Sequence, residues 1–206
     1  MTTRERILQS GLDLLSESGL AGVTLGVLAQ QAGVSKSGLF AHFHSKEELQ
    51  IALLDRMAEV SAAQVIQPAL RAAEGLPRLK ALVEHWLGWT TKAGLRGGCP
   101  VAAATFELDD AEGEVRAKVV AMEAYWRNLL TNLVRRSVEL GHLDSKLDIE
   151  QFVWELCGIY LSHHASSRLL RDNRADYRAL TAFDALVSRS LPAKRFAVVR
   201  PQKRLR

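Results

Sequence analysis

Apolar residues recur every three or four positions along most of the chain, which is the spacing of an amphipathic α-helix. No run alternates apolar and polar residues as a half-buried strand does, and no Asn-Gly or Asp-Gly hairpin turn occurs. The pattern therefore predicts an all-α protein of about nine helices. We expect residues 1–48 to form a small three-helix head and residues 49–206 to form a C-terminal helical bundle.

The first helix of the head is predicted over roughly residues 4–18, where Gly19 closes it, and the other two lie within residues 24–43. Gly33 separates these two, because glycine takes the positive φ that ends a helix without steric cost. Each of these two helices begins at a suitable N-cap residue. The residue just before each cap and the residue four positions after it are apolar, which fits a hydrophobic staple. The N-caps are Thr24 and Ser35, and the staples are Val23 with Leu28 and Val34 with Leu39.

The bundle begins with a long fourth helix, which is predicted to start at a capping box of Ser45 and Glu48 and to run toward Pro68. Asp109 and Asp110 are expected to cap another long helix. Five helices are predicted after Pro68, over roughly residues 76–93, 101–108, 111–141, 149–170 and 175–191. The helix over residues 149–170 is predicted to begin at a capping box of Asp148 and Gln151.

Composition places the chain among ordinary globular proteins. Of its 206 residues, 48% are hydrophobic and 24% are charged. No apolar run approaches the roughly 20 residues that span a bilayer, and the N-terminus lacks the apolar region of a signal peptide. We therefore expect a cytoplasmic protein with no membrane partner. Cys99 and Cys157 fall in no metal-ligand spacing, which favours two idle thiols and no metal site.

Charge is distributed unevenly. The net charge is +4, but residues 194–206 carry six Lys and Arg residues and no acid, so the preceding residues sum to about −2. The first 50 residues hold four basic and five acidic side chains. Nucleic-acid binding by the head must therefore rest on geometry and not on bulk charge. The basic tail is either a solvated terminus or a source of non-specific attraction for DNA.

Residues 24–43 have the layout of a helix-turn-helix that reads DNA. Leu39 and Phe43 lie four residues apart and share the face that packs on the rest of the head. Small residues in the first turn of the second helix allow close approach to DNA, and free backbone N–H groups there favour a phosphate or a base edge. The expected DNA-binding residues are Thr24, Ser35, Lys36, Ser37, Gly38, Phe40, His42 and Lys46. A helix pair around a glycine is also a generic packing unit, so this alternative stays open.

Several short pieces between Ile7 and Leu49 carry a resemblance, and all of them are in register. They are Thr24-Leu25, Leu28-Ala29, Ala32-Gly33-Val34-Ser35, Leu39-Phe40, His42-Phe43 and Ser45-Lys46-Glu47-Glu48-Leu49. With these pieces, the run from Ile7 to Leu49 resembles the head of the tetracycline-repressor (TetR) family of bacterial transcriptional regulators. The resemblance implies a homodimer in which one recognition helix per subunit reads half of a palindromic operator on double-stranded DNA.

Two positions depart from the family's pattern. The family commonly has tyrosine where Phe40 stands and often an aromatic residue where Ala41 stands, and their hydroxyl groups typically meet phosphate. Phe40 keeps the ring but lacks this donor. Together with the low charge of the head, this predicts fewer phosphate contacts per subunit and a shallower salt dependence than is usual.

Two roles are expected for the bundle under this resemblance. Its last two helices would form the dimer interface, although their apolar stripes also fit an intrachain core. The bundle would also hold an unidentified, largely apolar small-molecule effector, because aromatic side chains with polar tips suit such a pocket. The expected pocket residues are Trp86, Trp89, Phe106, Met122, Tyr125, Trp126, Trp154, Cys157 and Tyr160. His85, His163 and His164 are candidates to orient a polar group on that ligand.

The sequence thus predicts a ligand-responsive DNA-binding regulator, most simply a repressor. No carboxylate pair, Ser/His/Asp order or phosphate loop supports an enzyme, and we expect no cofactor. Two alternatives stay open: a constitutive DNA-binding dimer without a ligand, and a helical small-molecule-binding module whose head only packs.

Overall fold

A computed structural model describes residues 2–193, and every regular element in that range is a helix. The all-α prediction is therefore confirmed. The basic tail of residues 194–206 lies outside the described residues. The elements are α1 (Thr3–Gly22), α2 (Leu25–Ala32), α3 (Lys36–Phe40), α4 (Lys46–Ser61), the π-helix η1 (Ala62–Ile66), α5 (Gln67–Ala69), α6 (Leu76–Trp86), α7 (Trp89–Lys92), α8 (Pro100–Glu107), α9 (Glu114–Glu139), α10 (Ile149–Arg168) and α11 (Ala175–Arg189).

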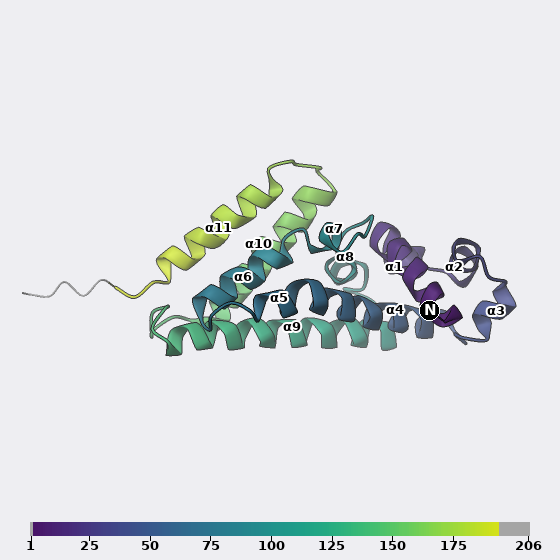
Figure 1. Cartoon of the computed structure of the whole chain (residues 1–206), viewed down its shortest axis with the longest axis horizontal. Helices are drawn as coiled ribbons and strands as arrows, with labels where there is room; N and C mark the ends of the chain where they lie inside the picture. Colours follow the sequence, from purple (N-terminus) through teal and green to yellow (C-terminus); the bar gives the residue numbers. More distant parts are fainter. Residues whose placement is uncertain (1, 194–206) are drawn as a thin grey trace, which may run out of the picture.

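The predicted number of helices is close to the observed one. Residues 46–69 run without a break through α4, η1 and α5, and a short kink at Leu87 and Gly88 separates α6 from α7. If each of these runs is counted once, residues 2–193 contain nine helices. Figure 1 shows α1, α2 and α3 at one end of the molecule and the long helix α9 along its body.

The head folds as its capping residues predict. Thr24 Oγ1 accepts a hydrogen bond from the Val27 amide at 3.2 Å, and Ser35 Oγ accepts one from the Gly38 amide at 3.0 Å. Gly33 ends α2 with φ 65° and ψ 34°, the left-handed conformation expected of it. The apolar side chains that close the head are fully buried, namely Val23, Leu28, Leu39 and Phe43.

Both predicted capping boxes form only in part. Glu48 accepts a hydrogen bond from the His44 amide instead of the Ser45 amide, so only half of the first box is present. The Gln151 side chain donates to Glu155 and not back to the start of the helix, so Asp148 alone caps α10. Both differences are local, because Ser45 and Asp148 still cap their helices.

The predicted start of α9 is wrong. Asp109 accepts a hydrogen bond from the next amide, that of Asp110, and so stabilises a turn and not a helix. The N-cap is Gly113, with φ 104°, and α9 begins at Glu114. Side chains of the Asp type favour such local turns as readily as they favour caps, so the sequence pattern alone does not separate the two.

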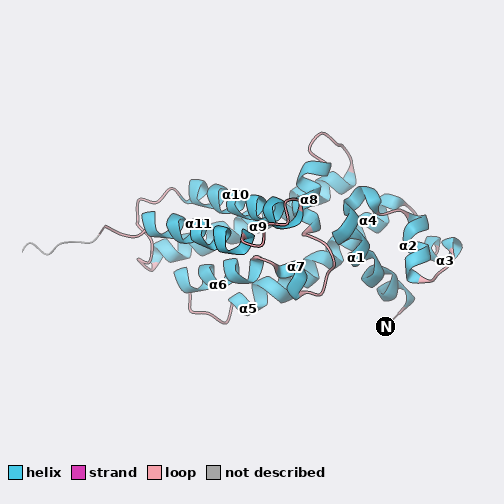
Figure 2. Cartoon of the chain, turned by 90° about the horizontal axis from the view of Figure 1, so that it is seen from above, coloured by secondary structure: helices cyan, strands magenta, loops and turns pink. Residues whose placement is uncertain are grey.

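One hydrophobic core joins the head to the body. It contains Leu12 and Leu39 of the head together with Val83, Leu130 and Phe152 of the body. The expected boundary between residues 48 and 49 falls in the first turn of α4, so a helix and not a linker crosses it. Figure 2 shows α10 and α11 side by side at the far end of the body. Within residues 2–193, no helix combines the length and the apolar character needed to cross a bilayer.

Candidate nucleic-acid interface and ligand cavity

The recognition helix α3 exposes small and polar side chains. Ser35, Lys36 and Ser37 are exposed, whereas Leu39 on the opposite side is fully buried. Phe40 is 48% exposed although it is a large apolar residue. Helix α3, which carries these side chains, lies at the tip of the molecule (Figure 1).

The other predicted DNA-binding residues surround this helix. Thr24 is exposed at the start of α2, while His42 and Lys46 are half-buried where α3 leads into α4. Lys36 lies over Gly26 of α2, since a Cβ atom at Gly26 would be 3.6 Å from Lys36 Cε. One expectation needs correction: the Gly38 amide is not free for DNA, because it donates to Ser35 Oγ.

Arg4 is a basic residue of the head that the sequence analysis did not select. Its guanidinium carbon lies 5.3 Å from the centre of the Phe43 ring, close to the end of the helix-turn-helix. Arg4 is exposed and belongs to the first turn of α1. The sequence shows Arg4 only as one of the four basic residues of the head. It does not indicate that Arg4 lies near Phe43, because the two residues are far apart along the chain.

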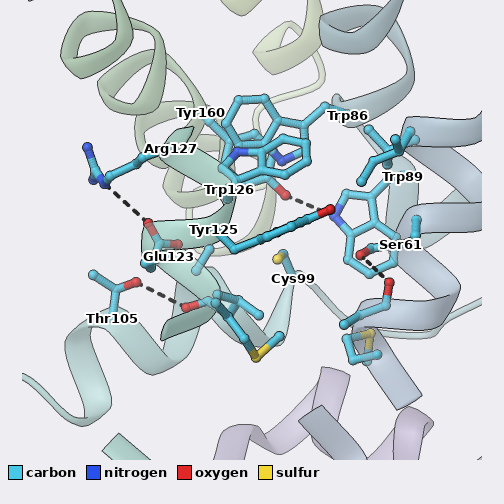
Figure 3. A pocket seen from close by; sticks show the side chains of 18 of the residues that line it. Ser61, Trp86, Trp89, Cys99, Thr105, Glu123, Tyr125, Trp126, Arg127 and Tyr160 are labelled. Carbon is cyan, nitrogen blue, oxygen red and sulfur yellow. Dashed lines mark hydrogen bonds and ion pairs between the residues drawn. The ribbon is translucent and has the colours of Figure 1, made fainter. Parts of the chain in front are cut away.

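A cavity of about 520 Å³ lies inside the body. Its wall is formed by α4 with η1, the α6–α7 region, α8, α9 and α10. Seven of the nine predicted pocket residues line it, and most of them appear as sticks in Figure 3. They are Trp86, Trp89, Met122, Tyr125, Trp126, Cys157 and Tyr160.

The prediction that Phe106 and Trp154 line this cavity is wrong. Each is 66% exposed, and neither belongs to the wall. On α10 the helical period turns Val153, Cys157 and Tyr160 inward, which leaves Trp154 on the outer face. Aromatic character alone predicts burial for both residues, whereas their position around the helix axis decides it.

Aromatic rings are gathered at one end of the cavity. The rings of Trp86 and Tyr160 stack with centroids 3.9 Å apart and an angle of 12°, and Trp126 meets Trp86 edge-on at 4.7 Å. Trp89 Nε1 donates to the Tyr160 hydroxyl at 3.1 Å. Stacked and edge-on pairs of this kind hold their rings in fixed positions. Figure 3 shows the cluster beside Glu123 and Arg127.

The charged residues of the cavity wall balance one another. Glu59 and Glu123 are the acids, and Lys118 and Arg127 are the bases. Glu123 lies 3.6 Å from Arg127, and Lys118 pairs with Asp55. Burial raises the pKa of Glu123, an effect that Arg127 partly opposes. The wall therefore presents apolar and aromatic surface with no net charge.

Both cysteines contribute to the wall of this cavity. Burial raises the pKa of the Cys99 thiol and of the Cys157 thiol, so both stay protonated. A protonated, buried thiol is a poor nucleophile, in keeping with the idle role expected for both.

The histidines considered for ligand orientation lie outside the cavity wall. His163 Nε2 is 2.6 Å from Asp176 Oδ1 and so connects α10 to α11. Burial lowers the pKa of His164, and the nearby charges of Arg168 and His163 lower it further. In the part of the chain that the structure describes, no group of three potential ligands could hold a metal ion.

Several wall residues were missed by the sequence analysis because they are small or aliphatic. They come from the last turn of α4, from η1 and from α8, and their types are common in any helical core. A π-helix contains one more residue per turn than an α-helix and often marks a functional site, but no sequence signal predicted it here. These residues include Met57, Ser61, Ala62, Val65, Val101, Ala102 and Thr105.

Comparison with known proteins decides the family. The model described as "Bacterial regulatory proteins, tetR family" matches residues 7–53, and the model described as "Tetracyclin repressor-like, C-terminal domain" matches residues 75–183. The chain belongs to the TetR family. The resemblance found in the sequence is thereby confirmed, and the TetR family is one of transcriptional regulators.

Individual members of the TetR family and their structures agree with this assignment. The transcriptional repressor NemR of Escherichia coli K12 is 28% identical over 141 residues, which cover 68% of each chain. A TetR regulator of Chloroflexus aurantiacus has a TM-score of 0.79 at 24% identity and covers 90% of this chain and 92% of its own. AibR, solved with isovaleryl coenzyme A and operator DNA, has a TM-score of 0.70 at 20% identity and covers 92% and 98%.

Proposed function

We propose that this TetR-family chain is a ligand-responsive repressor that binds a palindromic operator as a homodimer. One observation carries the proposal: the helix that begins in the DNA-binding head also forms the wall of the cavity. Residues 46–69 start at the end of the helix-turn-helix, and Met57, Ser61 and Val65 within them line the cavity. A change in the cavity can therefore move the head through one continuous helix.

The head would bind DNA through α3. Ser35, Lys36 and Ser37 would face the major groove, with Phe40 contacting its edge and Thr24 and Lys46 reaching phosphates on either side. Gly38 and the small side chains before it would permit close approach. A dimer would place its two α3 helices about one DNA turn apart, roughly 34–36 Å, to reach successive major grooves.

The dimer interface would be the outer face of α10 and α11. Large apolar side chains are exposed there, although monomeric proteins rarely expose such a patch. Small residues, Gly158 and Ala165, lie between them on α10 and would allow two helices to approach closely. The exposed apolar residues are Trp154 of α10, Tyr177 and Leu180 of α11, and, just past the ends of these helices, Leu169, Leu170 and Leu191.

The effector would be a neutral molecule with an aromatic or other flat apolar part. Stacked rings and a wall without net charge favour such a ligand over an ion. AibR was solved with both a small molecule and operator DNA, so one chain of this fold holds both. The effector would release DNA only if it binds one arrangement of the body better than the other, since equal affinity for both shifts nothing.

The test has two steps. DNA that binds the protein is first selected from a random library, and a gel-shift assay compares an inverted repeat from that selection with a scrambled duplex. We expect strong preference for the inverted repeat. A protein that stays monomeric and treats both duplexes alike would rule out this proposal and favour a module whose head only packs.

The second step uses N-phenyl-1-naphthylamine, a neutral aromatic probe that fluoresces in apolar surroundings. We expect it to bind the cavity and to weaken operator binding. Ala121→Trp places a ring at the cavity wall and should block the probe, whereas Ala124→Trp on the same helix lies outside the wall and should not. Probe binding that leaves operator affinity unchanged would indicate a constitutive DNA-binding dimer.

A further inference from the structure

A second hollow lies in the body, between the α6–α7 region and the turn that joins α10 to α11. It has a volume of about 600 Å³, and we call it the polar groove. Figure 1 shows α7 on the same side of the body as that turn. Trp89, Cys99 and Tyr160 border both the polar groove and the aromatic cavity, and the hydrogen bond from Trp89 to Tyr160 lies within this partition. The polar groove is therefore a separate space from the cavity.

Thr90 is a buried polar residue at the wall of the polar groove. It is only 8% exposed, and its hydroxyl makes no hydrogen bond with any residue in the range 2–193. Buried polar groups are normally hydrogen-bonded, so this hydroxyl lacks the partner that its position requires. Thr90 borders the polar groove and not the cavity. A molecule that supplies the missing partner would therefore occupy the groove.

His163 leaves a second buried group free at the same wall. The residue is 7% exposed, and its Nε2 atom lies 2.6 Å from Asp176 Oδ1. Since a carboxylate only accepts, Nε2 carries the proton, and Nδ1 of the neutral ring is left as an acceptor. Nδ1 has no hydrogen-bond partner in the described part of the chain. Thr90 and His163 can thus both accept from an O–H or N–H group of a ligand.

The acids of the polar groove leave further acceptors free. The Glu84 carboxylate is exposed and makes no hydrogen bond or ion pair with the described residues. Asp176 uses only its Oδ1 atom, for His163. The third acid, Asp172, is already paired with Arg178 at 3.1 Å. Two carboxylates are therefore available to a positively charged donor.

The bases of the polar groove are engaged with backbone carbonyl groups. Lys92 Nζ donates to the carbonyl oxygens of Glu84 at 2.8 Å and Leu87 at 3.0 Å. Arg168 donates to the Arg96 carbonyl at 3.5 Å. His164 adds no positive charge at pH 7, because burial lowers its pKa. The groups that remain free are thus mainly acceptors, and they select a ligand that donates.

We propose that the polar groove is a second ligand site and that it binds a small organic ammonium ion that also carries a hydroxyl group. The ammonium group would donate to Glu84 and Asp176, and the hydroxyl group would donate to Thr90 or His163. An anion would meet carboxylates without partners, and an apolar molecule would leave the Thr90 hydroxyl unpaired. This inference goes beyond the proposed function and requires neither DNA binding nor a ligand in the cavity.

The test compares three molecules of the same chain length that differ in charge. They are 4-aminobutan-1-ol, the neutral butane-1,4-diol and the anion 4-hydroxybutanoate. Isothermal titration calorimetry on the full chain at low salt should show saturable binding of 4-aminobutan-1-ol at one site per subunit. We expect it to bind at least about tenfold more tightly than the other two, because hydrogen bonds between charged groups are roughly twice as strong as neutral ones.

Two pairs of variants test the named contacts. Thr90→Val removes the hydroxyl at nearly unchanged volume and should weaken binding of 4-aminobutan-1-ol by roughly threefold to tenfold, whereas Thr90→Ser should restore it. Glu84→Gln removes an exposed charge without a folding risk and should weaken binding by about tenfold. Glu112→Gln is its matched control, since Glu112 is exposed and lies outside both walls, and it should behave as the wild type.

The location is tested with Ala121→Trp, because Ala121 lines the cavity and not the polar groove. Binding of 4-aminobutan-1-ol should persist in this variant, and its loss would place the amine in the cavity and overturn the second site. Equal binding of butane-1,4-diol would overturn the choice of an ammonium ion. Absence of saturable binding, or binding that Glu84→Gln leaves unchanged, would overturn the site itself. None of these results depends on N-phenyl-1-naphthylamine or on the operator, so the proposed function stands or fails separately.

Discussion

At the scale of single residues, the head depends on a few side chains whose roles follow from local chemistry. Thr24 and Ser35 cap their helices because a hydroxyl can accept from an amide two or three residues later, and Gly33 accepts a positive φ. Ser35 is itself a cap, but the exposed side chains of Lys36 and Phe40 in α3 take no part in these contacts, which leaves them available to DNA. Their substitution should therefore affect DNA binding more than folding.

Lys36→Ala should weaken operator binding by about tenfold and reduce the slope of log affinity against log salt by about 0.9 for each phosphate that is no longer neutralised. The reason is the removal of one exposed cation per subunit, and gel-shift titrations at two salt concentrations measure it. An unchanged slope would place Lys36 away from phosphate.

Gly38→Leu should nearly abolish operator binding through a clash at the groove. The fold should tolerate it, because leucine favours helices and the nearest atom to a Cβ at this position, Ser35 Oγ at 3.1 Å, has to move by only a few tenths of an ångström. Gly38→Ala is the matched control and should weaken binding less. Wild-type DNA binding by the folded leucine variant would contradict the docking of α3.

His164 should make stability depend on pH. The pKa of His164 is lowered in the folded protein, chiefly by burial. Below the ordinary histidine value of about 6.5, the unfolded chain therefore binds a proton more readily than the folded chain does. Stability should therefore fall as the pH drops from 7.5 to 5.5. His164→Gln should show a smaller decrease in melting temperature over this range at equal protein concentration, and equal decreases would exclude the residue.

At the scale of elements, the run of residues 46–69 shows which features of a helix the sequence pattern predicts and which it does not. Its length and its capped start are predictable, because Ser45 and the apolar positions at Leu49, Leu53 and Met57 are local signals. The π-helix η1 within it is not predictable, because no local sequence signal marks it. Three of its residues, Ala62, Val65 and Ile66, line the cavity.

Deleting Ala62 should convert η1 to regular α-helix, because a π-helical segment accommodates one extra residue. We expect the fold and operator binding to persist, while the affinity for N-phenyl-1-naphthylamine falls by roughly tenfold, or about 1.4 kcal/mol. Circular dichroism and fluorescence titration measure the two effects. Unchanged probe affinity would mean that η1 does not shape the cavity.

At the scale of the whole molecule, the exposed face of α10 and α11 predicts assembly. Trp154→Glu should convert the proposed dimer to a monomer, because it would place a charge in the proposed apolar interface. Phe106→Glu is a matched control, since Phe106 is equally exposed, at 66%, but lies on α8. Analytical ultracentrifugation measures the mass, and operator binding should disappear together with the dimer. A dimer that survives Trp154→Glu would place the interface elsewhere.

The sequence by itself determined the helical class, most helix boundaries and the helix-turn-helix, because periodicity, caps and turn glycines act within a few residues of one another. It also indicated that aromatic side chains of the body gather around a pocket. Only the tertiary structure decided which of these aromatic side chains face the cavity and that Trp154 and Phe106 face outward. It also decided that the Glu107 carboxylate accepts hydrogen bonds from the Leu20 and Ala21 amides, next to the interruption of α1 at Gly19. Those outcomes depend on how helices far apart in the chain rotate and pack against one another, and no local pattern encodes that rotation.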